Sequence, residues 1–317
     1  QGESFPTEYD KAHDPNSRDV TAVIHVRKPM SEPRVHRCFP GGPNDLEKYR
    51  MEVLHGVHDH WIDPAAGKWE YTYHERLREY KVPHCRGFDL SPGVADYCPG
   101  IGKNSHRVID QIFGPGGVVE KLKKAPHSRR AQAVTWQAWN DMQISDPACL
   151  QRLWFRCQKV ESDEAIAIRQ ELNRMHMEWK TKDFPRVAAA AEAKIASLPT
   201  KSVLNMNIHI RSNDAYRAAM MNMYAFVELQ AMVAEALGVE VGEYIHIADS
   251  FHIYGSYFEE FERFLKTVRS RSTAENSYRT DDETFIEMSI EGLDELLAEA
   301  DMQIGRASCR ERVYHPV

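Results

Sequence analysis

Residues 201–238, KSVLNMNIHIRSNDAYRAAMMNMYAFVELQAMVAEALG, join a strand pattern to a long apolar helix pattern. Over 203–210 the side chains alternate, so that one face of a strand carries Leu204, Met206, Ile208 and Ile210. Residues 218–238 are nearly all apolar and end at Gly238, a common helix C-cap. An apolar helix of this kind is usually buried in a large core, so the stretch predicts a sheet packed on a central helix.

Strand and helix patterns continue outward from this stretch. Three β-branched or alternating stretches predict strands: 21–28, 149–160, and 243–255 as a strand pair or one bent strand. Other stretches predict helices. A short helix carries Glu52, with Asp45 near its N-cap, and a helix, a break and a second helix extend from VIDQIF (108–113) to Lys124. The peripheral stretch 161–196 and the amphipathic stretch FEEFERFLKTVR (258–269) are also predicted to be helical. Residues 57–100 have little periodicity and predict loops and short pieces of secondary structure. The fold class predicted is α+β.

The chain is predicted to hold one catalytic domain, residues 21–303, with a helical insertion at 161–200. Polar residues 1–20 predict a flexible N-terminal arm. The ending IGRASCRERV resembles a translated sequencing adapter. Residues 304–317 are therefore predicted to be a non-native tail.

Composition excludes several classes of protein. The 317 residues are 42% hydrophobic and 27% charged, which is typical of a soluble globular protein. The net charge of −7 argues against non-specific nucleic-acid binding. Neither an apolar run of about 20 residues nor signal-peptide character is found, so we expect no membrane partner. Six cysteines without metal-site spacing indicate reduced thiols and a cytoplasmic location.

Arginines and a cysteine are the first candidates for chemistry. Arg129 and Arg130 precede a predicted strand and could bind a phosphate, although a solvated basic corner is the commoner case. Arg211, followed by Ser212, ends an apolar strand and could equally meet an anion or reach solvent. Cys149 opens a strand, and neighbouring arginines would make its thiol nucleophilic, whereas most buried cysteines are inert.

Three further polar side chains lie in strongly patterned elements. Asn222 lies inside the apolar helix and must find partners; it can donate and accept hydrogen bonds, as a pyrimidine edge requires, or cap a neighbouring strand. His252 and Tyr254 alternate on one strand face, where they could bind a sugar hydroxyl or be satisfied groups at a sheet rim. Individually, none of these residues decides the function.

The ordered set resembles the thymidylate synthase family. SRR (128–130), PAC (147–149) at the start of a strand, RSND (211–214), an asparagine and HIY (252–254) follow the family order. The gap of eight from Asp214 to Asn222 and the gap of thirty from Asn222 to His252 match the family without insertion. The likeness is weak over 50–78 and good over 109–158 and 201–265. It implies a large twisted mixed sheet flanked by helices, in a sheet-to-sheet homodimer with shared active sites.

The resemblance also implies roles for single residues. Cys149 resembles the nucleophile, with Asn222 holding the pyrimidine edge, Glu52 organising proton transfer and Tyr73 near the C5 proton. Substrate contacts are implied for six residues: Arg211 and Ser212 on the phosphate, Arg129 and Arg130 on the phosphate of the neighbouring subunit, and His252 and Tyr254 on the 3′-hydroxyl. Asp214, His58 and Trp61 resemble residues that face the folate, 5,10-methylenetetrahydrofolate.

Departures from the family pattern are concentrated near the same motifs. Leu150 stands where the family has a histidine, Trp154 where it has a glutamine, and Met220-Met221 where it has Pro-Phe. HDHW (58–61) replaces Trp-Asp-Glu-Trp, so His58 stands in the place of a tryptophan that packs on the folate intermediate. The family's N-terminal phosphate arginine has three candidates: Arg27, Arg34 and Arg37.

The chemistry implied is one-carbon transfer to C5 of a pyrimidine nucleoside monophosphate. Thiolate addition at C6 makes C5 nucleophilic, and the one-carbon unit ends as methyl after hydride transfer or as hydroxymethyl after water addition. The departures favour a hydroxymethylase acting on dUMP or dCMP; Asn222 suits uracil. Two alternatives stay open: methylation of the thymidylate synthase type, and a non-catalytic nucleotide-binding relative.

Overall fold

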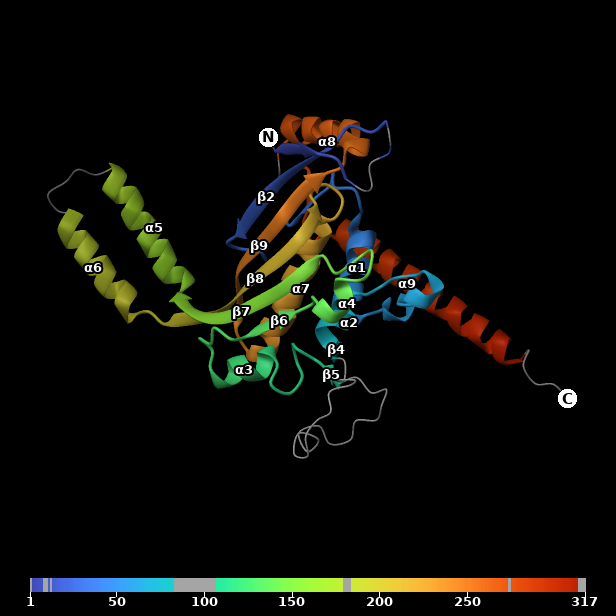
Figure 1. Ribbon diagram of the computed structural model, residues 1–317. Coiled ribbons are helices and arrows are strands. Elements are labelled where there is room, and N and C mark those ends of the chain that lie inside the picture. The colour runs from blue at the N-terminus through green and yellow to red at the C-terminus, as the bar shows by residue number, and fades with distance from the viewer. Residues whose placement is uncertain are drawn as a thin grey trace, which may run out of the picture.

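A six-stranded mixed sheet lies at the centre of the computed structural model, which describes residues 2–7, 11, 13–82, 107–178, 184–272 and 275–312 (Figure 1). The strands follow one another across the sheet in the order β1 (Glu3–Phe5), β2 (Ser17–Val26), β9 (Glu240–Ile253), β8 (Thr200–Asp214), β7 (Leu150–Glu161) and β6 (Gln132–Val134). Neighbours are antiparallel except β8 and β9, which are parallel. A parallel pair requires a crossover, and helix α7 (Ala219–Leu237) provides it.

The core lies between one face of this sheet and α7. Leu204, Met206, Ile208 and Ile210 of β8 are all buried, as their alternation predicts. Helix α7 ends where Gly238 adopts a left-handed conformation with φ of 67°, which confirms the predicted C-cap. The stretch 243–255 forms one long strand rather than a strand pair.

Smaller helices surround this core. Helix α1 (Pro43–His55) packs against both α7 and α9 (Glu283–Arg312), and α8 (Phe258–Ser270) lies at one end of the sheet. The remaining short elements are η1 (Asp59–Trp61), η2 (Pro64–Ala66), α2 (Tyr73–Arg78), α3 (Val118–Lys124), α4 (Ala138–Asp141), η4 (Gly255–Tyr257) and the strand pairs β3 (Val35–His36) with β10 (Ser277–Tyr278) and β4 (Tyr80–Val82) with β5 (Arg107–Ile109). Among the helices described, none is both long and apolar enough to cross a membrane.

Two helices extend away from the body of the protein. Helices α5 (Asp163–Glu178) and α6 (Phe184–Ser197) lie side by side and project from one end of the sheet (Figure 1). This arrangement confirms that the described residues 163–178 and 184–196 are helical and peripheral. That the segment is an insertion stays a prediction.

Two expectations about local structure are wrong. Residues 1–20 were expected to be a loose arm, but β1 pairs with the start of β2, which begins at Ser17 and continues to pair with β9. Residues 109–113 were expected to start a helix, but β5 ends at Ile109 and Asp110 Oδ1 then accepts hydrogen bonds from the N–H groups of Ile112 and Phe113. A side-chain carboxylate used in this way closes a turn and competes with helical hydrogen bonds.

Three other parts of the prediction concern residues at the limit of the description. The backbone of α9 continues through Arg312, into the segment expected to be a tail; that this tail is non-native stays a prediction. Cys85, Cys98 and the second half of the predicted loop region, residues 83–100, lie outside the described residues.

The sheet face opposite α7 has no covering helix in the described part of the chain (Figure 1). Rows of side chains cross this face from strand to strand. One row joins Trp154, Asn207, Ile245 and His25, and the next joins Arg152, His209, Ile247 and Val23.

Candidate active site

A cavity of about 580 Å³ lies between α1, the start of α2 and the segment before β7. Helix α1 contributes Tyr49 and Glu52, which are three positions apart and therefore share one face of the helix. Tyr71 and Tyr73 contribute a second wall, and Asp146 a third. Phenols and carboxylates therefore form much of the lining, which also includes Lys68 and Trp69.

Cys149 lies half-buried directly behind Tyr71, at the start of β7. Its backbone N–H donates to the Tyr71 hydroxyl at 3.2 Å, and its carbonyl accepts from the backbone N–H of Arg211 at 2.8 Å. Burial raises the pKa of the Cys149 thiol, and the carboxylate of Asp146 adds to this increase. The positive charge of Arg211 and a hydrogen bond to Tyr71 act in the opposite direction.

Arg211 anchors the turn that presents this thiol. Its Nη2 donates to the carbonyl of Pro147 at 2.6 Å and its Nε to that of Ala148 at 3.2 Å. The half-buried guanidinium is therefore placed beside Cys149 by backbone acceptors. Ser212 follows on β8 and lies opposite Ser250 of β9.

Asn222 reaches from α7 to the cavity wall. The residue is buried, and its Oδ1 accepts a hydrogen bond of 2.5 Å from the hydroxyl of Tyr49. Burial raises the pKa of Tyr49 well above its ordinary value, and the nearby charge of Glu52 adds to this effect. Tyr73 is also enclosed, with its ring 5.7 Å from that of Phe226, and burial raises its pKa in the same way.

Glu52 is held by a histidine that the chain folds back against it. Gly56 ends α1 with φ of 66°, and a Cβ there would lie 2.2 Å from His74 Nδ1, so the tight turn requires glycine. This turn returns His58 to the helix, where its Nδ1 lies 2.9 Å from Glu52 Oε2. His58 is 8% exposed and stacks on Trp61, with ring centroids 3.8 Å apart and planes at 9°. Trp69 meets Trp61 edge-on at 5.0 Å.

A second polar group lies at the ends of β8 and β9. His252 is buried, with Nδ1 3.2 Å from the Ser250 hydroxyl, which donates to Asp19 at 2.6 Å. The rings of His252 and Tyr254 meet edge to face at 4.7 Å, so both lie together as the alternation predicts.

Asp214 is engaged within the chain. Its Oδ1 accepts hydrogen bonds from the backbone N–H groups of Tyr216 and Arg217, and its Oδ2 accepts one from the hydroxyl of Tyr257. Both carboxylate oxygens therefore help to fix the turn that leads from β8 to α7.

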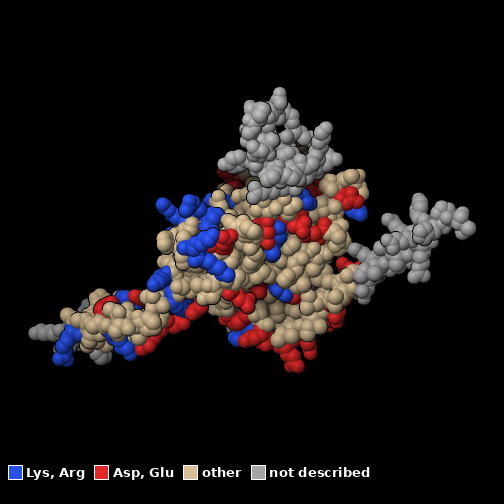
Figure 2. Space-filling model, turned by 90° about the horizontal axis from the view of Figure 1, so that it is seen from below, with Lys and Arg blue, Asp and Glu red and all other residues tan. Residues whose placement is uncertain are grey.

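Arg129 and Arg130 lie outside this cavity. Both are exposed on the turn before β6, and Trp154 Nε1 donates to the Arg129 carbonyl at 3.0 Å. Lys and Arg gather on the surface near the base of the α5–α6 extension (Figure 2). The three candidates for the N-terminal phosphate arginine have different surroundings. Arg34 pairs with Glu228 at 2.7 Å, Arg37 stacks on Tyr278, and Arg27 is exposed.

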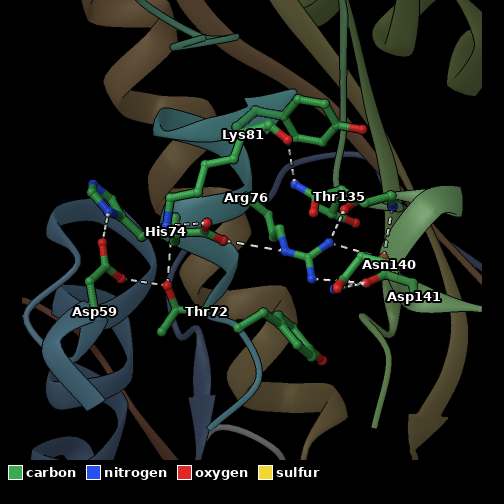
Figure 3. A network of polar contacts seen from close by, with 12 residues as sticks. Asp59, Thr72, His74, Arg76, Lys81, Thr135, Asn140 and Asp141 are labelled. Atoms are coloured by element: carbon green, nitrogen blue, oxygen red, sulfur yellow. Dashed lines mark hydrogen bonds and ion pairs between the residues drawn. The ribbon is translucent and has the colours of Figure 1, made fainter. Parts of the chain in front are cut away.

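A buried polar network, centred on Arg76 and Asp141, lies next to Tyr71 of the cavity wall (Figure 3). Arg76 of α2 is 2% exposed and forms two hydrogen bonds with Asp141 of α4, at 2.9 and 2.8 Å. Its guanidinium also donates to the Thr135 carbonyl at 3.0 Å and lies 5.4 Å from the centre of the Tyr71 ring. The N-terminus of α2 is capped by Thr72, whose hydroxyl donates to Asp59.

The structure therefore brings together seven of the thirteen predicted residues around one cavity and places four others in the group at the sheet end. Of the seven, Glu52 and Tyr73 line the cavity, and the other five contact it through one or two side chains: Cys149, Asn222, Arg211, His58 and Trp61. Four others, Ser212, Asp214, His252 and Tyr254, belong to the group at the ends of β8 and β9.

Sequence reasoning missed Tyr49 and Tyr71 at the cavity. Tyr49 lies three residues before Glu52 on a helix, a spacing that could have indicated it. Tyr71 had no comparable signal, because its contact with Cys149 spans 78 residues.

A mixed sheet around a central helix, with a cysteine, an arginine and a glutamate at one cavity, is the architecture of an α+β enzyme. Comparison with known proteins gives the family: the thymidylate synthase family profile matches residues 44–294. The chain therefore belongs to the thymidylate synthase family, as its motifs predict, and is a one-carbon transferase.

Individual relatives agree with this family. A protein of Methanocaldococcus jannaschii named "Putative thymidylate synthase" is 24% identical over 278 residues, covering 83% of this chain and 89% of the relative. A protein of the same name from Methanosarcina mazei is 26% identical over 220 residues, covering 69% and 79%. The thymidylate synthase of Streptococcus thermophilus is 36% identical over 63 residues, covering 20% and 22%. The family indicates C5 one-carbon transfer to a nucleotide.

Proposed function

We propose that this protein transfers a one-carbon unit to C5 of dUMP or dCMP and releases the 5-hydroxymethyl nucleotide. The observation that carries the proposal is the position of Cys149, whose thiol interacts with Arg211 and Tyr71 at the edge of a cavity that contains Glu52. A cysteine in this position can add to C6 of a pyrimidine, and the adjacent positive charge favours its thiolate.

Each neighbouring side chain has a place in this reaction. Asn222 would hold the pyrimidine edge, with its orientation fixed by the hydrogen bond from Tyr49. Tyr73 would lie near C5, and Glu52 would accept or return protons there. Arg211 would meet the phosphate while it retains its bonds to the carbonyls of residues 147 and 148.

The residues present fit a folate at the mouth of the cavity. 5,10-Methylenetetrahydrofolate supplies the one-carbon unit, and in the methylating reaction also a hydride. Trp69 lines the cavity and offers the flat aromatic surface that a pterin or benzoyl ring requires, and Trp61 supports it by an edge contact at 5.0 Å. Asp214 fits a folate contact less well, because both of its oxygens already accept hydrogen bonds.

His58 favours hydroxymethylation over methylation. An indole at this position would exclude water from the one-carbon unit, whereas His58 gives an imidazole joined directly to Glu52. Glu52 could then position a water for attack, with its own orientation fixed by the 2.9 Å contact. Methylation of the thymidylate synthase type remains the second candidate, on the ground of the family.

A homodimer would complete the site. The uncovered sheet face carries mixed apolar and polar rows, including Trp154, Ile245, Ile247 and Val23, which suit a second copy of the same face. Arg129 and Arg130, exposed beside this face, would then reach the phosphate in the partner subunit. His252 and Tyr254 would bind the 3′-hydroxyl of the sugar.

Incubation with 5,10-methylenetetrahydrofolate and either dUMP or dCMP, followed by mass spectrometry, tests the proposal. We expect a product heavier by CH₂O, and loss of tritium from the C5-tritiated nucleotide. A product heavier by CH₂, with formation of dihydrofolate, would instead establish methylation. Absence of tritium release with both nucleotides, despite nucleotide binding, would support the non-catalytic alternative. Cys149→Ser is the matched variant and should abolish release.

A further inference from the structure

A third titratable side chain, Glu299 of α9, lies next to the Glu52–His58 pair. His58 Nε2 is enclosed and has no hydrogen-bond partner among the described residues, although the side chain is 8% exposed. The nearest acid is Glu299, whose Oε2 lies 3.9 Å from this nitrogen. A buried polar atom without a partner is costly and therefore calls for an explanation.

We propose that Glu52, His58 and Glu299 form a proton relay that connects the cavity with the protein surface. Glu52 lines the cavity, His58 lies behind it, and the Glu299 side chain is 42% exposed. The imidazole therefore separates an enclosed carboxylate from one that exchanges protons with water. The inference rests on the proposed function only in taking Glu52 as the group that exchanges protons with the substrate.

The hydrogen bonding fixes the direction of each proton. A carboxylate only accepts, so Nδ1 carries the hydrogen that is donated to Glu52, and Nε2 is the basic nitrogen. When a protonated Glu299 turns toward Nε2 and closes the 3.9 Å gap, its O–H bond breaks as an N–H bond forms at Nε2, and Nδ1 then releases its own proton to Oε2 of Glu52. One N–H bond forms as the other breaks, so a single proton enters the cavity. The reverse transfer removes one.

Trp61 holds the His58 ring in its orientation, and two further titratable groups lie near the relay. Trp61 lies parallel to the imidazole and limits its rotation, so both nitrogens keep their direction. Among the described residues, other titratable groups nearby include His60, whose ring centre is 6.5 Å from that of His58, and Lys48, which pairs with Glu295 and lies within electrostatic reach of Glu299. Glu295 is one helical turn from Glu299 and provides a matched control.

Nitrogen NMR of the full chain without substrate is the first test. Long-range nitrogen–proton spectra at neutral pH, assigned with His58→Asn, should show His58 with hydrogen on Nδ1 and an unprotonated Nε2. The opposite tautomer would overturn the relay. This readout does not depend on turnover, so it separates failure of the relay from failure of the proposed reaction.

Kinetics provide the second test. His58→Asn keeps a donor near Nδ1 but removes the relay, so kcat should fall by about a hundredfold with KM unchanged. Glu299→Gln should lower kcat in the same direction, whereas Glu295→Gln should not. In mixtures of light and heavy water, the curved dependence of the wild-type rate should become linear in both relay variants. Wild-type kcat and curvature in Glu299→Gln would contradict the proposal, even if His58→Asn does not fold.

Discussion

The buried ion pair between Arg76 and Asp141 supports the tyrosine wall, and its removal has a calculable cost. Asp141→Asn keeps the size of the side chain but removes the negative charge and one acceptor. The guanidinium, 2% exposed, would then face an amide group where it now has a carboxylate at 2.8 and 2.9 Å. Breaking a buried pair from one side costs about 3–5 kcal/mol. Glu75 remains 3.3 Å from Arg76 Nε, so we expect about 3 kcal/mol.

Urea unfolding followed by circular dichroism measures this change. The midpoint should fall without a change in slope, and the melting temperature should drop by roughly 6 °C. Asp281→Asn is the control, because Asp281 pairs with Arg279 at the surface and its loss should have no resolvable effect. The double variant R76M/D141L should be more stable than Asp141→Asn alone. A loss below about 0.5 kcal/mol in Asp141→Asn would refute the reasoning.

Three further predictions concern the site and the core. Burial raises the pKa of Cys149, so its alkylation in the free protein should speed up only above the pH expected for an exposed thiol, and faster alkylation at neutral pH would contradict this. Tyr49→Phe should cost about 1 kcal/mol by leaving Asn222 Oδ1 unpaired, and should raise KM for the nucleotide; an unchanged KM would exclude the orienting role. Burial lowers the pKa of His246 to about 4 from 6.5, so the unfolded chain binds its proton first as pH falls, and about 3 kcal/mol of stability should be lost between pH 6.5 and 4. His246→Gln should reduce this pH dependence, and equal curves would refute the assignment.

The elements predicted correctly have a period that burial enforces. In β8, residues 204, 206, 208 and 210 must all face the core, so a shift by one residue would bury polar groups instead. In α7, the almost uncharged sequence can only be accommodated inside the protein. The alternation in β8 and the apolar composition of α7 are visible in the sequence alone, so both elements can be predicted without the tertiary fold.

The errors arose where a single side chain or a distant strand decides the structure. Asp110 closes a turn with its own carboxylate, although the residues after it have a helical composition. Residues 17–20 have no strong strand pattern of their own and become a strand because β9 pairs with them. Local sequence propensity predicts neither the turn closed by a side chain nor the pairing with a distant strand.

The candidate site shows the same division. Motif order predicted Cys149, Arg211 and Asn222, but not the hydrogen bond from Tyr49 to Asn222, which spans 173 residues. His58 was identified only as the substitute for a tryptophan. Its pairing with Glu52 follows from the left-handed turn at Gly56, which the sequence does not specify alone.

Burial sets the protonation state of the phenols that line the cavity. Burial raises the pKa of Tyr49, Tyr71 and Tyr73, so each keeps its proton and serves as a hydrogen-bond donor or acceptor. Burial raises the pKa of the Cys149 thiol as well, which favours its protonated form. We therefore expect the group that exchanges protons during C5 chemistry to be an acid such as Glu52. Because burial also limits the access of water, that acid needs a defined path for protons, and His58 is the titratable side chain in contact with it.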